Sequence, residues 1–116
     1  MRSIAAFVLV AAALAAGGST ASAAVRPVTL TIVVGTHGVA GGPKKFTVRK
    51  NAHVLLRVKS AVGKAVHLHG YDIEKPIRSR TTYVLMPFVA RIAGVFEIEV
   101  HITESLGIRI GLLTVK

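Results

Sequence analysis

The chain has 116 residues, no cysteine and no tryptophan, and its 15 Lys and Arg against 5 Asp and Glu give a formal net charge of +10. This length holds one domain, and the lack of cysteine excludes disulfides, zinc–thiolate sites and thiol catalysis. Aromatic residues make up only 5%, which leaves few rings for stacking on single-stranded nucleic acid.

The first 23 residues have the pattern of a secretory signal peptide. Arg2 gives a positive start, residues 4–16 form an apolar run, and Ala21-Ser22-Ala23 matches the small-x-small motif of signal peptidase sites. The apolar run is shorter than the roughly 20 residues that a membrane-spanning helix needs, which favours cleavage over an uncleaved anchor. We therefore expect cleavage after Ala23, export to the periplasm or the extracellular space without a transmembrane anchor, and a folded domain over residues 24–116.

From residue 28 onward, hydrophobic residues alternate with polar ones, as in Val28, Leu30, Ile32 and Val34. Alternation with a period of two predicts strands that place one face on a core. Stretches rich in Gly, Pro, Asn and Ser separate the apolar segments and predict turns. The expected strands cover residues 28–34, 44–49, 53–59, 65–73, 80–88, 95–102 and 108–115.

These segments predict an all-β fold, because no helical period of useful length follows residue 25. About seven strands with regular turn signals are typical of an antiparallel Greek-key β-sandwich. A closed OB-like barrel has the same local pattern and is the alternative fold. In the segment 95–102, we expect Phe96, Ile98 and Val100 to face the core and the two glutamates between them, Glu97 and Glu99, to pair with basic surface residues.

A histidine cluster is the densest chemical feature of the sequence. His67 and His69 stand two residues apart, so on a strand their imidazoles lie on the same side, about 7 Å apart at the Cα atoms. We place His101, from a later strand, near the same end, with the carboxylate of Glu104 following it. Imidazole ligands suit copper and zinc, so the hypothesis is a site for Cu(II) or Zn(II) formed by His67, His69 and His101.

The alternative is that these histidines are ordinary hydrogen-bonding residues and that no metal binds. His37, in a glycine-rich loop, and His53, after a turn, are expected to be solvated. The sequence shows no Gly-x-Ser-x-Gly elbow, no phosphate loop and no carboxylate pair for acid–base work, so we do not expect an enzyme.

Basic residues are spread along the chain rather than clustered. A net charge of +10 favours association with an acidic protein, a wall polymer or an anionic membrane surface. Nucleic acid is disfavoured as a partner because of the expected export and the missing aromatic platform.

Over residues 28–115 the chain resembles a cupredoxin. The resemblance is carried by the strand pair in residues 44–59, by the sequence HGYDI at 69–73, and by the closing segments GVFEIEV at 94–100 and GLLTV at 111–115. It is most similar to small exported cupredoxin-like domains of bacteria, including the domain attached to periplasmic iron-uptake proteins. The resemblance implies a β-sandwich with the first copper-ligand position at His69.

The same resemblance places Val100 at the position of the ligand cysteine, the second ligand histidine near Thr103 and the axial methionine near Ile108. A blue-copper site needs a thiolate, so type 1 electron transfer is excluded, and we expect Val100 to pack in the core. The expected function is histidine-based copper or zinc binding in an exported cupredoxin-like domain. The alternative is a metal-free structural or interaction module that uses the basic surface.

Overall fold

The computed structural model describes residues 25–116, and the expected signal peptide over residues 1–23 lies outside this part of the chain. The described residues form strands and turns without a helix, as expected. The strands are β1 (Val28–Val34), β2 (Lys44–Val48), β3 (His53–Ser60), β4 (Ala65–Leu68), β5 (Ile73–Pro76), β6 (Val84–Val89), β7 (Gly94–His101) and β8 (Gly107–Val115). Within residues 25–116 there is thus no helix of the length and hydropathy needed to cross a membrane.

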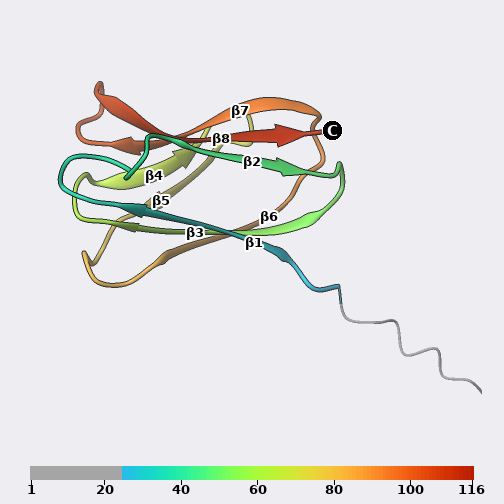
Figure 1. Cartoon of the computed structure of the whole chain (residues 1–116), viewed down its shortest axis with the longest axis horizontal. Coiled ribbons are helices and arrows are strands. Elements are labelled where there is room, and N and C mark those ends of the chain that lie inside the picture. Colours follow the sequence, from blue (N-terminus) through green and yellow to red (C-terminus); the bar gives the residue numbers. More distant parts are fainter. Residues whose placement is uncertain (1–24) are drawn as a thin grey trace, which may run out of the picture.

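The strands form two sheets that face each other (Figure 1). One sheet has three strands in the order β1-β3-β6, and the other has five in the order β2-β8-β7-β4-β5. The predicted β-sandwich is therefore confirmed. Its sheets are mixed rather than purely antiparallel, because β1 pairs with β3 and β2 pairs with β8 in parallel.

The core lies between the two sheets and is made of the inward residue of each alternating pair. Ile32 in β1 and Met86 in β6 are fully buried on one side, and Leu68 in β4 and Ile98 in β7 are fully buried on the other. Val100 is also 0% exposed, as expected. Burial of a valine or leucine side chain contributes roughly 1.5–3 kcal/mol, so these alternating residues hold the sheets together.

The segment 65–73 does not form the single strand that its alternation predicts. The strand β4 ends at Leu68, and the chain then reverses so that β5 pairs antiparallel with β4. The reversal uses positive φ angles of 81° at Gly70 and 53° at Asp72. A side chain at Gly70 would also place its Cβ 2.3 Å from the ring of Phe96, so this turn needs glycine. The structure therefore has eight strands, and β6 starts at Val84, later than expected.

Candidate metal centre

Two neighbouring strands of the five-stranded sheet bring the three predicted histidines together. His67 lies in β4, His69 is the first residue after it, and His101 is the last residue of β7. The strands β4 and β7 pair antiparallel, with Ala65 opposite His101. Val66 and Leu68, on either side of His67, are fully buried in the core. Because side chains alternate between the faces of a strand, the imidazole of His67 is directed to the outer face of the sheet.

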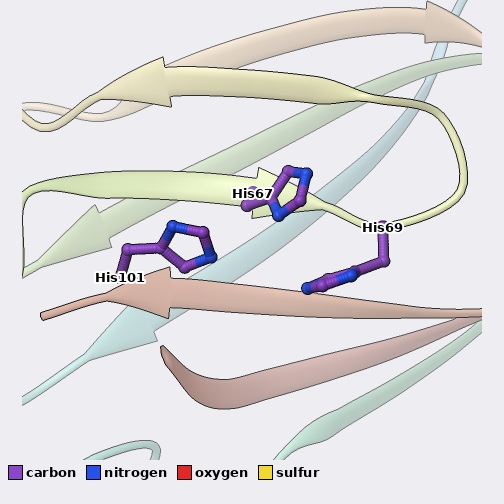
Figure 2. A group of neighbouring side chains, drawn as sticks. All are labelled: His67, His69 and His101. Atoms are coloured by element: carbon purple, nitrogen blue, oxygen red, sulfur yellow. The ribbon is translucent and has the colours of Figure 1, made fainter. Parts of the chain in front are cut away.

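The three imidazoles form a compact group. Each offers one ligand atom, and these atoms all lie within 4.8 Å of one another. The ring centroid of His67 is 4.3 Å from that of His69 and 5.1 Å from that of His101. Figure 2 shows the ring of His67 between the other two, which come from opposite directions along the sheet. All three side chains are half-buried, so the group is partly shielded and still reachable from solvent.

The carboxylate of Glu99 lies beside two of these rings. Its Oε2 atom is 2.8 Å from Nε2 of His69 and 3.6 Å from Nε2 of His101. The hydrogen bond with His69 is the main cause that lowers the pKa of Glu99, and it outweighs the opposing effect of burial. The side chain of Glu99 is only 19% exposed, and the hydrogen bond with His69 favours its charged form in spite of this burial.

The carboxylate beside the histidines is not the one that the sequence predicts. We expected Glu104 near the histidines and Glu99 in a pair with the basic surface, but Glu99 contacts two histidines and Arg109 pairs with Glu97. The outward parity of Glu99 was readable from the sequence. Its position opposite His67 was not, because the register between β4 and β7 is a tertiary property.

A second carboxylate, that of Glu74 in β5, reaches the group from the other side. Its Oε1 atom is 3.4 Å from Nδ1 of His101. His101 therefore has a carboxylate near each of its ring nitrogens. In metal sites, a carboxylate at the far nitrogen of a ligand histidine fixes the orientation of the ring, which leaves Nε2 of His101 for the centre of the group.

His67 has a polar atom without a partner. Its Nδ1 atom is shielded from solvent and makes no hydrogen bond. Leaving such an atom unpaired costs roughly 1–3 kcal/mol, so a ligand at this nitrogen is favourable. An ion held between the imidazoles would supply such a ligand.

The outer-face histidines do not coincide with the copper position that the family resemblance implies. Val100, at the position of the ligand cysteine, is fully buried on the inner face of β7. His69, at the first ligand position, contacts Glu99 on the outer face. These two positions therefore lie on opposite faces of the sheet and do not form one site. Met86 is buried in the core at 0% exposure, so its sulfur is also away from the histidines.

The two remaining histidines stand apart from this group. His37 lies in the loop after β1 and His53 at the start of β3, in the other sheet. Both are exposed, as expected.

No family model matches the sequence, and a search among curated proteins finds no match. A search of solved structures finds a similar fold in an NMR solution structure of a copper binding protein in the apo form. The TM-score is 0.54 and the identity is 13%, over 78% of this chain and 91% of that chain. At this identity the likeness defines the fold alone, which is that of a two-sheet β-sandwich.

Proposed function

We propose that this chain binds one divalent transition-metal ion, Cu(II) or Zn(II), through His67, His69 and His101. The observation that carries the proposal is the convergence of three imidazoles from two paired strands, with ligand atoms within 4.8 Å of one another. Imidazole is the ligand that both ions accept readily in the absence of sulfur.

Two further observations support this function. Nδ1 of His67 is buried without a hydrogen-bond partner, which is unusual for an imidazole with no role. The fold is also shared with a protein described as copper-binding. Since the chain has no cysteine, the proposed function is metal binding without type 1 electron transfer.

Metal binding requires the three rings to move closer. In a tetrahedral site with metal–nitrogen bonds of about 2.0–2.1 Å, ligand nitrogens lie about 3.3 Å apart. Rotation of the half-buried side chains supplies this closure, and His69 has additional freedom because it lies at the start of a turn.

The test is metal retention by the purified protein after loading and dialysis, measured by elemental analysis. We expect the wild type to retain one equivalent of Cu(II) or Zn(II), and the triple variant His67→Ala, His69→Ala, His101→Ala to retain none. The matched control is His37→Ala, His53→Ala, which removes exposed histidines outside the group. A wild type without metal, or a triple variant that retains as much as the control, would contradict the proposal.

We propose as a second function that the three-stranded sheet docks on an anionic membrane surface. All 5 acidic residues lie between positions 72 and 104, on the five-stranded sheet or in its turns. The outer face of the three-stranded sheet instead carries Arg57 and Lys59, which lie 4.1 Å and 5.2 Å from the ring centre of Tyr83. Leu85 is 54% exposed on the neighbouring strand. Cations beside exposed apolar groups suit an interface of anionic lipid headgroups.

Sedimentation with vesicles tests this second proposal. We expect the protein to bind phosphatidylserine vesicles and not phosphatidylcholine vesicles. Binding to phosphatidylserine should weaken steeply between low and physiological salt. Arg57→Gln, Lys59→Gln should lose binding, whereas Lys44→Gln, Lys45→Gln, with the same change of charge on the other sheet, should keep it. Equal loss in both double variants would show that net charge alone is responsible, and it would refute the proposed face.

A further inference from the structure

Glu99 contacts two of the three histidines. Glu99 lies directly opposite His67 in the pairing of β4 with β7. A single oxygen, Oε2, lies 2.8 Å from Nε2 of His69 and 3.6 Å from Nε2 of His101. This carboxylate therefore contacts two of the three imidazoles and lies across the strand pair from the third.

The guanidinium of Arg109 pairs with a different carboxylate. Arg109 is the cross-strand partner of Glu99 in β8, yet its side chain pairs with Glu97. Among the described residues, the ion-pair contacts of Glu99 are with His69 and His101. The chain has 15 Lys and Arg residues, yet the ion-pair partners of this carboxylate in the described part of the chain are imidazoles, which are themselves the proposed metal ligands.

The backbone of β8 keeps space for the carboxylate. Gly107 pairs with His101, and a Cβ atom at Gly107 would stand 2.6 Å from Oε2 of Glu99. The same Cβ would stand 3.3 Å from Cδ2 of His101. The absence of a side chain at this position thus leaves room for both groups.

We infer that Glu99 supplies a fourth ligand, a carboxylate oxygen, and thereby makes the site selective for divalent over monovalent ions. This inference rests on the proposed metal-binding function. Three imidazoles and one carboxylate complete the four-coordinate donor set that Zn(II) and Cu(II) accept. Soft monovalent ions such as Cu(I) and Ag(I) prefer sulfur and gain less from a carboxylate oxygen. Glu74 acts differently, because it holds the far nitrogen of His101 and orients the ring.

The experiment compares Glu99→Gln with Glu104→Gln, which removes the same charge from an exposed turn. Affinities for Zn(II) and Cu(II) are measured by chelator competition, and that for Ag(I) is measured in parallel as the monovalent probe. We expect Glu99→Gln to weaken divalent binding by about 10–100-fold, to leave Ag(I) binding unchanged and to alter the Cu(II) EPR parameters. Glu104→Gln should match the wild type in all three.

Each contrary outcome has a separate meaning. A wild type that binds no divalent ion refutes the proposed function itself. Divalent binding that is equal in Glu99→Gln and Glu104→Gln refutes the ligand role of Glu99 and leaves the histidine site intact. Equal weakening of divalent and Ag(I) binding also refutes it, because Glu99 would then only orient the imidazoles. Glu99→Asp, which keeps the charge and shortens the reach, provides a second variant, and thermal unfolding of each metal-free variant confirms that it is folded.

Discussion

Gly107 lies at a point of the surface where a single methyl group would change the histidine group. It is exposed, but its Cβ would collide with Oε2 of Glu99 at 2.6 Å. We expect Gly107→Ala to displace Glu99 and His101 and to weaken Cu(II) or Zn(II) binding by about 10–100-fold, the usual effect of disturbing groups that support metal ligands. Isothermal titration calorimetry measures this change.

Gly35→Ala is the control for this substitution. A Cβ at Gly35 would meet only the carbonyl oxygen of Gly38, at an ordinary 3.5 Å. Its metal affinity should equal that of the wild type. If Gly107→Ala also keeps the wild-type affinity, the carboxylate and His101 do not occupy the binding geometry that we propose.

Sequence patterns predict some of these residues and not others. His67 and His69 share one face because their spacing matches the period of a strand. His101 was expected near them only because a later strand can run to the same end of the sheet. Glu99 and Gly107 were missed as members of the group, because both depend on cross-strand register. Local alternation contains no information on which residue of a neighbouring strand stands opposite.

The two faces of β7 have separate tasks. The inner face packs Ile98 and Val100 in the core, and the outer face presents Glu99 and His101. An irregularity in the pairing with β8 lies between Ile98 and Glu99, where β8 contributes the additional residue Ile110. Such bulges redirect side chains. This one shifts the register of β8 by one residue, so that Gly107 pairs with His101 and lies beside Glu99.

This division predicts that core stability and metal binding respond to different substitutions. Ile98→Ala removes a fully buried side chain and should lower the free energy of unfolding of the metal-free protein by about 2–5 kcal/mol. Val95→Ala, at a position 64% exposed on the same strand, should change it by less than about 0.5 kcal/mol. Urea unfolding followed by circular dichroism measures both.

Saturating metal should stabilise Ile98→Ala by the same increment as the wild type, since the ion binds only the folded state. An unfolding free energy of Ile98→Ala close to that of Val95→Ala would show that β7 is not anchored through this face.

At the scale of elements, most strands were predicted close to their observed positions, because alternation marks them directly. The error at 65–73 has a local cause. The alternation of His67, His69, Tyr71 and Ile73 continues through the turn, and it conceals the reversal at Gly70. A glycine inside an alternating segment was the available signal for this turn.

Over the whole molecule, the two-layer sandwich could be predicted from the number and spacing of strands, whereas its parallel pairs could not. The chain passes from one sheet to the other between β1 and β2, and again between β2 and β3. As a result, β1 lies beside β3 and β2 beside β8, with the same direction in each pair. Two separate sheets also exclude the closed-barrel alternative for the described residues.

The acidic residues and the proposed membrane-binding cations lie on different sheets. Acidic residues and the histidine group belong to the five-stranded sheet, while Arg57 and Lys59 occupy the outer face of the three-stranded sheet. The two proposed activities therefore use opposite surfaces. Variants at one surface should leave binding at the other unchanged.

The central claim is that His67, His69 and His101 hold one ion together, and side-chain NMR of the histidines tests it most directly. The chain has 5 histidines, so each imidazole can be followed while Zn(II) is added to the ¹⁵N-labelled protein. We predict that the signals of His67, His69 and His101 change together and saturate at one equivalent, while those of His37 and His53 stay in place. Unchanged signals for the three, or changes that reach His37 and His53 equally, would contradict the account.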